Sequence, residues 1–203
     1  MSVLPALRKR LLQGGAGLSW QAQKRNSACK AALIGPELER LDCRSVLDVG
    51  CNAGQVSREL SSGRFVVGLD QRLDLRGFSD PLKGVALGEF PLDAENAKYL
   101  PTFDAVLLLS VHHQWIATLD SDEADAMFRQ VLAIAQTAMF VEFAALSAKF
   151  GSDELFVDND AASVRNFATS YLAKFCSREK VKFLGSCPES QHEPERFMFL
   201  IEK

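Results

Sequence analysis

Short apolar segments alternate with helical patterns along most of this 203-residue chain. We expect strands at 45–49, 65–70, 103–110 and 138–143, and a weaker one within 85–92. The four clear segments are apolar on both faces, as the strands of a parallel sheet must be when helices cover both of its sides. The alternation therefore predicts an α/β domain built from successive strand–helix units.

Apolar residues recur with helical spacing in two stretches, 124–135 and 164–175. Each stretch places its apolar residues on one face, which indicates a helix that packs against the sheet. Two further segments, 181–184 and 197–201, read as strands with only a loop between them. Strands joined in this way pair antiparallel.

The predicted fold is thus a seven-stranded, mostly parallel sheet with helices on both faces and one antiparallel edge strand. A helix is expected at about 20–41, ahead of the first strand, and a surface loop with four carboxylates at 149–160. We accordingly divide the chain into an N-terminal helical extension, 1–43, and a main domain, 44–203.

The charge of the chain is unevenly distributed. The formal net charge is -3, but residues 1–36 carry six Lys and Arg and no Asp or Glu. Such a segment can contact phosphate groups or an anionic surface, although a solvated extension on the edge of a domain is the commoner arrangement. The negative net charge of the whole chain gives no general attraction to nucleic acid.

The five cysteines are odd in number, scattered, and without a CxxC pair. This pattern favours free thiols in a reducing cytoplasm over a disulfide framework or a zinc site. Basic residues interrupt the apolar N-terminal segment, unlike a secretory signal. The longest apolar run, 105–109, is far shorter than the roughly 20 residues that span a bilayer. We therefore expect a cytoplasmic protein without a membrane span.

Ligands of open α/β sheets bind beyond the carboxyl ends of the strands, so the chemistry should be found there. The first strand ends around Asp48 and leads into a turn that contains Gly50, Asn52 and Gly54. Glycine allows a tight turn and close approach to a ligand, and asparagine tolerates a positive φ. The second strand ends at Asp70, 22 residues after Asp48, a spacing that suits a carboxylate holding ribose hydroxyls.

The turn lacks the G-x-G-x-x-G pattern of dinucleotide-binding enzymes, because Asn52 and Ala53 follow at the second and third positions after Gly50. A dehydrogenase is therefore the poorer interpretation. The strand before the turn, the helix after it and the acid at the end of the next strand favour a different nucleoside ligand.

The segment 48–54 resembles the first motif of class I S-adenosylmethionine (SAM)-dependent methyltransferases, an acidic residue followed by G-x-G-x-G, with asparagine in place of the middle glycine. The acid at the end of the second strand is similar to the family's ribose-binding acid, and the segment 103–110 resembles its fourth strand. The close resemblance covers about 44–143. It implies that SAM is the cofactor and is bound by Asp48, Gly50, Cys51, Asn52, Gly54, Asp70, Gln71, the adenine-side pair Asp93 and Ala94, and Ser110.

Methyl transfer from a sulfonium depends largely on positioning the two reactants. A base is needed only when the acceptor keeps its proton, as a hydroxyl does. His112 and His113 directly follow Ser110, and imidazole titrates near pH 6.5. We predict that one of them acts as the base, His113 ahead of His112; packing against the cofactor is the alternative. No metal site is expected, because adjacent side chains in an extended segment point in opposite directions.

Two further side chains are candidates for binding the acceptor. Trp115 follows the histidines, and Glu142 closes the fifth strand. For Glu142 the alternative is a helix-capping or solvated carboxylate. The resemblance also implies that the N-terminal extension covers the SAM pocket as a lid.

The sequence therefore predicts an enzyme that transfers a methyl group from SAM to an oxygen or nitrogen of a small-molecule or sugar-containing acceptor. Two alternatives remain open. An RNA or DNA methyltransferase would hold phosphates with its basic N-terminal segment, and its binding would weaken steeply with salt. A non-catalytic SAM-binding partner protein would bind SAM without turnover.

Overall fold

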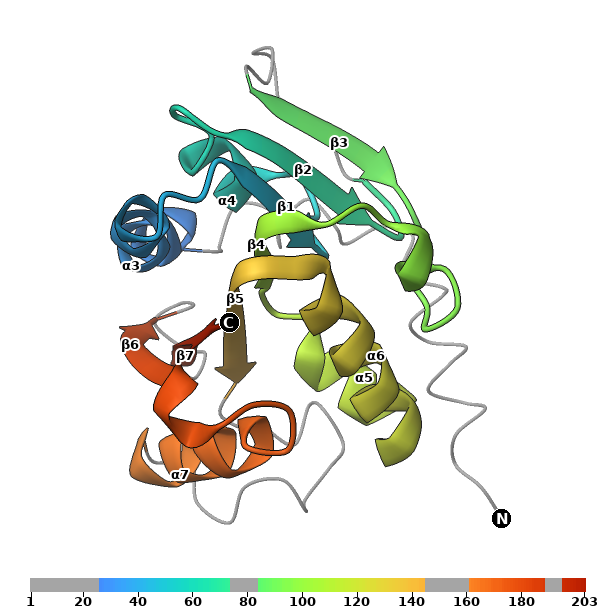
Figure 1. The fold of residues 1–203 in the computed structure, drawn as a ribbon, viewed down its shortest axis with the longest axis vertical. Helices are drawn as coiled ribbons and strands as arrows, with labels where there is room; N and C mark the ends of the chain where they lie inside the picture. Colours follow the sequence, from blue (N-terminus) through green and yellow to red (C-terminus); the bar gives the residue numbers. More distant parts are fainter. Residues whose placement is uncertain (1–25, 74–83, 145–160, 189–194) are drawn as a thin grey trace.

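The computed structural model describes residues 26–73, 84–144, 161–188 and 195–203. Seven strands form one sheet in the order β3-β2-β1-β4-β5-β7-β6 (Figure 1). Their bounds are β1 Ser45–Val49, β2 Phe65–Asp70, β3 Val85–Glu89, β4 Phe103–Leu108, β5 Ala135–Ala144, β6 Val181–Cys187 and β7 Arg196–Glu202. The predicted seven-stranded, mostly parallel sheet is confirmed.

The order of the parallel strands reverses between β1 and β4. β2 and β3 lie on one side of β1, whereas β4 and β5 lie on the other, and all five run parallel. The central strand β1 thus comes first in the sequence, β2 and β3 extend the sheet on one side of it, and the chain then crosses back to form β4 and β5 on the other side. The loops that leave β1 and β4 diverge at this switch point, which is where α/β sheets bind ligands.

The antiparallel strand does not lie at the edge, so the expectation of an antiparallel edge strand is wrong. β7 runs antiparallel to both β5 and β6 and lies between them. The physical reason is that β7 (RFMFLIE) is the more apolar of the two strands. Six of its seven residues are buried, whereas β6 (VKFLGSC) is mostly half-buried. An apolar strand gains more from an inner position, which leaves the more polar β6 to form the edge.

Helices cover both faces of the sheet (Figure 1). α3 (Ser27–Arg40) and α4 (Gln55–Glu59) pack on one face, where Ile34 and Leu38 are fully buried against the sheet. α5 (His112–Thr118), α6 (Ser121–Ile134) and α7 (Ala161–Leu172) pack on the opposite face. Two short 3₁₀ helices, Ala97–Tyr99 and Arg178–Lys180, complete the described elements.

Local signals explain where the longer helices begin. The Asp120 carboxylate accepts a hydrogen bond from the Glu123 N–H at 2.8 Å and caps α6, whose apolar face matches the predicted 124–135 pattern. Asn26 caps α3 in the same way through the Cys29 N–H at 3.1 Å. The start of the predicted 20–41 helix, the basic segment before residue 26 and the predicted 149–160 loop lie outside the described residues.

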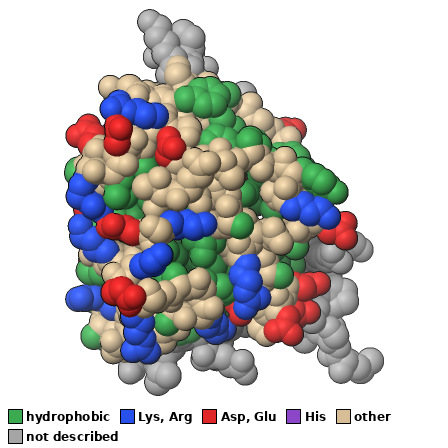
Figure 2. Space-filling view, viewed as in Figure 1, with side chains coloured by type: hydrophobic (Ala, Val, Ile, Leu, Met, Phe, Trp, Pro, Cys, Tyr) green, Lys and Arg blue, Asp and Glu red, His purple; other side chains and the backbone are tan. Residues whose placement is uncertain are grey.

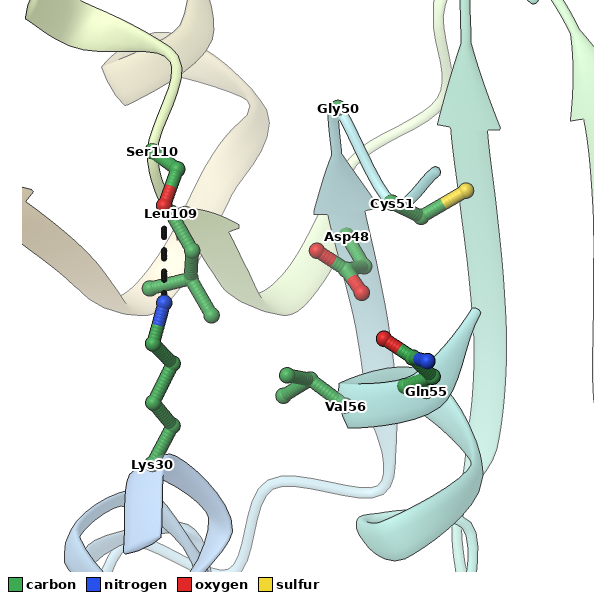
Figure 3. Close-up of a pocket in the computed structure, with 8 residues that line it drawn as sticks. All are labelled: Lys30, Asp48, Gly50, Cys51, Gln55, Val56, Leu109 and Ser110. Atoms are coloured by element: carbon green, nitrogen blue, oxygen red, sulfur yellow. Dashed lines mark hydrogen bonds between the residues drawn. The ribbon is translucent and has the colours of Figure 1, made fainter. Parts of the chain in front are cut away.

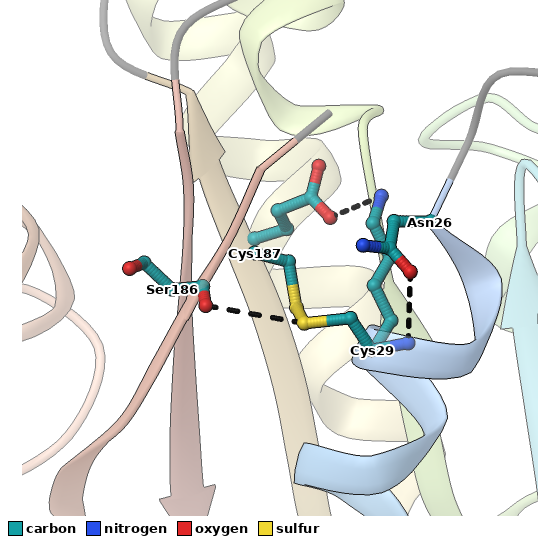
Figure 4. The surroundings of a disulfide bond; sticks show 6 residues. Asn26, Cys29, Ser186 and Cys187 are labelled. Carbon is teal, nitrogen blue, oxygen red and sulfur yellow. Dashed lines mark hydrogen bonds and ion pairs between the residues drawn. A yellow bond between two sulfur atoms is a disulfide. The ribbon is translucent and has the colours of Figure 1, made fainter. Parts of the chain in front are cut away.

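Cys29 of α3 and Cys187 at the end of β6 form a disulfide (Figure 4). The prediction of five free thiols is therefore wrong for this pair. Spacing could not indicate the bond, because 158 positions separate the two residues and only the packing of α3 against β6 brings them together. Cys43, Cys51 and Cys176 are free. None of the helices in the described ranges combines the length and hydrophobicity needed to span a bilayer.

Candidate functional site

A pocket lies at the carboxyl ends of β1 and β4, at the switch point of the sheet (Figure 3). Figure 3 shows Asp48 projecting from β1 and Lys30 reaching upward from α3 toward Ser110. The pocket therefore joins the turn after β1 to the end of β4 and to the helix that precedes the sheet. It is lined by Lys30, Asp48, Gly50, Cys51, Gln55, Val56, Leu109 and Ser110.

The turn after β1 depends on left-handed backbone conformations. φ is +75° at Gly50, +54° at Asn52 and +71° at Gly54. A Cβ at Gly50 would lie 2.2 Å from the Val111 Cγ2 atom, so only glycine lets the turn pass this close to the segment after β4. Asn52 occupies the αL region that its side chain tolerates, as its place in the sequence predicts.

Asp70 at the end of β2 contacts this turn directly. The Asn52 N–H donates to Asp70 Oδ2 at 2.8 Å, and the Arg72 N–H donates to Oδ1 at 3.0 Å. The Gly50 N–H donates to the carbonyl of Leu69 at 2.7 Å. The first motif and the acid of the second strand thus form one unit. An ionised carboxylate has about four acceptor positions, so Asp70 retains capacity for donors from a ligand.

Asp48 contributes a buried carboxylate to the wall of the pocket. Only 2% of it is exposed, and its Oδ2 accepts a hydrogen bond from the Ser57 hydroxyl at 2.6 Å. Bonds to a charged acceptor are stronger than neutral ones, so this contact fixes the start of α4 against β1. Burial raises the pKa of the neighbouring Cys51 thiol, which keeps it protonated.

The adenine-side candidates lie apart from the pocket lining. The exposed Asp93 accepts hydrogen bonds from the N–H groups of Glu95 at 2.9 Å and Asn96 at 2.7 Å, and so caps a turn after β3. Ala94 lies within that turn, and Gln71 is exposed next to the end of β2. Their contacts with a cofactor stay predictions.

Lys30 is a site residue that sequence reasoning missed. Its Nζ lies 2.5 Å from Glu142 Oε2 and donates to the Ser110 hydroxyl at 3.4 Å, while Ser110 donates to Glu142 Oε1 at 2.6 Å. All three residues are at most 4% exposed. The sequence did contain a signal for its burial. Lys30 precedes Ile34 by four residues and Leu38 by eight, which places all three on the same buried face of α3.

Glu142 is a buried, ion-paired carboxylate, not a solvated one. Burial tends to raise its pKa, but the Lys30 charge and hydrogen bond, the Ser110 hydroxyl and the Arg196 charge together lower the pKa below the ordinary 4.5. Arg196 Nε lies 4.0 Å from Glu142 Oε1. A role of Glu142 in acceptor binding stays a prediction, and the ammonium that it already binds belongs to Lys30.

Ser110 turns the chain from β4 into α5. Its φ of +57° is uncommon for a residue with a side chain and persists only where the surroundings enforce it. Those surroundings are the Lys30 and Glu142 bonds and the Gln114 amide, which donates to the Ser110 carbonyl at 2.7 Å. The network therefore determines how α5 leaves the pocket.

The two histidines begin α5, so the expectation of an extended segment is wrong: the Ser110 bend starts a helix instead. His112 is 1% exposed and contacts the rings of Phe128, Phe143 and Tyr171 edge-on. Burial lowers the pKa of His112 to about 3, which keeps the ring neutral near pH 7. This packing disfavours His112 as a base and leaves His113, which is 9% exposed, as the stronger candidate.

Trp115 is half-buried and packs against the core under α6 and α7. Its contact with an acceptor stays a prediction. Among the described residues, no group of three or more His, Cys, Asp or Glu side chains lies close enough to hold a metal ion.

No family model and no curated protein matches the sequence, but solved structures match the fold. The bifunctional kinase-methyltransferase WbdD is 19% identical with a TM-score of 0.66, and the match covers 92% of this chain and 42% of WbdD. The methyltransferase domain of bacterial CtHen1-C is 18% identical with a TM-score of 0.58 over 90% and 98% of the two chains. Magnesium protoporphyrin IX methyltransferase (ChlM) from Synechocystis PCC 6803 with bound SAH (S-adenosylhomocysteine) is 17% identical with a TM-score of 0.53 over 87% and 81%.

The chain has the class I methyltransferase fold. It spans less than half the length of the WbdD chain, and at these identities the likeness extends to the fold alone. The class I methyltransferase fold implied by the first motif is thus confirmed.

Proposed function

We propose that this chain binds SAM and transfers its methyl group to an oxygen or nitrogen of a small-molecule or sugar-containing acceptor. The observation that carries the proposal is the contact between the Asn52 N–H and the Asp70 carboxylate at the switch point of the sheet. That contact joins a glycine turn and a ribose-type acid in one place, which the binding of an adenosyl group requires.

Asp70 is assigned to the ribose. Backbone N–H groups already orient both of its oxygens, so the carboxylate is preorganised to accept two hydroxyl donors. Asp93 and Ala94 are assigned to the adenine side, and Ser110 to the side of the reacting centre.

The charged side chains that line the pocket suit the amino-acid end of SAM. Asp48 provides a carboxylate that complements the ammonium of SAM, and the Lys30 ammonium, which is already paired with Glu142, lies on the same lining. Gly50 allows the backbone to approach the ligand without a Cβ. Cys51 and Gly54 belong to the same turn.

When bound, SAM supplies a methyl group on a positively charged sulfur that leaves as a neutral thioether. The protein's contribution is to hold the acceptor in line with that methyl group and to exclude water. For a hydroxyl acceptor, His113 is assigned to take the proton, because it lies in the first turn of α5, three residues after the pocket residue Ser110, and is less buried than His112.

A small acceptor is favoured over nucleic acid. On the face seen in Figure 2, Lys and Arg side chains are interspersed with Asp and Glu instead of forming a continuous basic stripe. The net charge of -3 supports the same preference. A nucleic-acid acceptor predicts binding that falls steeply between low and high salt, and this is directly measurable.

Calorimetric titration of the full chain with SAM, SAH and NAD tests the cofactor. We expect binding of SAM and SAH and none of NAD; preference for NAD would overturn the proposal. Transfer of labelled methyl from SAM to a panel of hydroxyl- and amine-bearing metabolites and glycans tests catalysis. Tight SAM binding without transfer to any acceptor would instead support the non-catalytic SAM-binding partner.

A further inference from the structure

The disulfide connects the beginning of α3 to the end of β6. Cys29 lies in the first turn of the helix, beside the Asn26 cap, and Cys187 is the last residue of the edge strand (Figure 4). Cys187 is 1% exposed, whereas Cys29 is only half-buried. Cys29 is therefore the less buried end of the disulfide.

The residue next to the disulfide is a residue of the pocket. Lys30 follows Cys29 directly, and its ammonium lies 2.5 Å from Glu142 Oε2 and 3.4 Å from the Ser110 hydroxyl. Lys30 and Ser110 line the pocket together with Asp48 and Gly50. The placement of the first turn of α3 thus decides whether the Lys30 ammonium reaches the site.

The remainder of α3 has attachments of its own. Ile34 and Leu38 are fully buried, and Glu37 pairs with Lys182 of β6 at 2.5 Å. The first turn depends instead on the disulfide, on the Asn26 cap and on the buried bonds of Lys30 itself. Helix ends open locally at lower free energy than helix centres, so the first turn can detach while the rest of α3 stays in place.

We propose that Cys29–Cys187 is a reversible thiol–disulfide site that controls the cofactor pocket through Lys30. The inference rests on the proposed function, because the controlled property is the binding of SAM and its product SAH. In the oxidised form the bond holds the first turn of α3 against β6 and Lys30 against Glu142. Reduction releases that turn and weakens cofactor binding.

The chemistry requires a dithiol as the co-reactant. One thiolate of the dithiol attacks the Cys29 sulfur, the Cys29–Cys187 bond breaks, and Cys187 leaves as a thiolate that takes up a proton. The second thiol of the reagent then displaces Cys29 from the mixed disulfide. Two protein thiols form, and the dithiol is oxidised to its own disulfide.

Coupling between the two sites must be reciprocal. If reduction weakens SAH binding by a given factor, then SAH shifts the reduction equilibrium of Cys29–Cys187 toward the disulfide by the same factor. We expect a factor between about 5 and 150, the usual range for two coupled sites. Lys30 lies between them and carries the coupling.

Calorimetric titration of the full chain with SAH, in the oxidised state and after reduction by dithiothreitol, tests the proposal. The reduced wild type and the Cys29→Ser/Cys187→Ser variant should both bind SAH more weakly than the oxidised wild type. The control Cys176→Ser removes a half-buried thiol outside the pocket and should keep the full response. Lys30→Met should bind SAH with the same affinity in both redox states.

The following results would overturn either this proposal or the proposed function. Equal SAH affinity of the oxidised and reduced wild type overturns the proposal, and so does a response that persists at full size in Lys30→Met. Where the double serine variant fails to fold, the wild type still decides: its dithiol reduction equilibrium must shift with SAH, and an unchanged equilibrium overturns the inference. Failure of the oxidised wild type to bind SAH at all overturns the proposed function itself.

Discussion

The two ends of the candidate site are built in different ways. The β1–β2 end, from Asp48 to Gly54 together with Asp70, is held by positive φ angles and by hydrogen bonds from backbone N–H groups to the Leu69 carbonyl and the Asp70 carboxylate, all within 23 consecutive residues. The β4–β5 end, Ser110 and Glu142, is held by side chains, and one of these, Lys30, comes from a helix 80 positions before Ser110.

The first end therefore depends on local backbone conformation, whereas the second depends on side-chain contacts between distant parts of the chain. Short-range backbone geometry creates a nucleotide-type cradle that any sequence with the right turn residues can form. The second end depends on a buried ion pair, whose desolvation cost must be offset by good geometry. We infer that substitutions at the β1–β2 end act mainly on cofactor affinity, and that substitutions at the β4–β5 end act first on stability.

The largest effect is expected for Lys30→Met, which leaves the Glu142 carboxylate buried without its nearest cation. Breaking one side of a buried pair costs about 3–5 kcal/mol. Denaturant-induced unfolding of wild type and variant measures the loss. A loss of unfolding free energy below about 1 kcal/mol would mean that the Lys30–Glu142 pair contributes no more than an exposed salt bridge. The two ends of the site would then not differ in how they are held.

The same pair predicts a pH dependence. The pKa of Glu142 is lowered in the folded protein, so its stabilising contribution is complete above the ordinary pKa of 4.5 and disappears as the pH falls through the lowered value. The free energy of unfolding of the wild type should therefore decrease below about pH 4.5, and Lys30→Met should show a smaller decrease. Identical pH profiles would contradict the assigned pair.

His113→Ala should lower turnover by about 10²-fold while leaving SAM affinity nearly unchanged, because it removes a base and no cofactor contact. His112→Phe is the matched control, since an aromatic ring suits its contacts with Phe128, Phe143 and Tyr171. Steady-state rates and calorimetry separate the two quantities. Full activity of His113→Ala together with an inactive but folded His112→Phe would reverse the assignment.

Asp70→Ala should weaken SAM binding by about 1.5–3 kcal/mol, the usual worth of hydrogen bonds to a charged group. Calorimetric titration measures this loss, and unfolding experiments should show a smaller effect than that of Lys30→Met. Unchanged affinity would mean that the cofactor does not contact the end of β2.

The smallest effect is expected for Ser57→Ala. It removes the hydroxyl that donates to Asp48 at 2.6 Å, a single bond worth about 1–2 kcal/mol of folding free energy. Thermal unfolding measures it. A loss as large as that of Lys30→Met would show that the β1–β2 end also depends on buried side-chain pairing.

The strand segments of the parallel sheet and the β1–β2 end could be predicted because local patterns determine them. Apolar segments alternating with helical spacing specify parallel strands, and Asp48, the glycine turn and Asp70 follow each other at a fixed spacing. The antiparallel position of β7 escaped prediction, because strand neighbours are chosen by burial in the whole sheet and not by chain order.

The β4–β5 end could not be predicted because its contacts are long-range. Nothing around Lys30 indicates that its partner is Glu142, and nothing around Cys29 indicates Cys187, since each contact arises only when α3 packs on the finished sheet. The helix that starts at His112 was also missed, because the left-handed conformation of Ser110 comes from tertiary bonds, not from its residue type.

A crystal structure of the chain with SAH tests the central claim most directly. The account predicts the ribose hydroxyls on the Asp70 carboxylate and the amino-acid end between Gly50 and Lys30, at the switch point of β1 and β4. Ligand density in a different part of the molecule, with the turn after β1 empty, would contradict it.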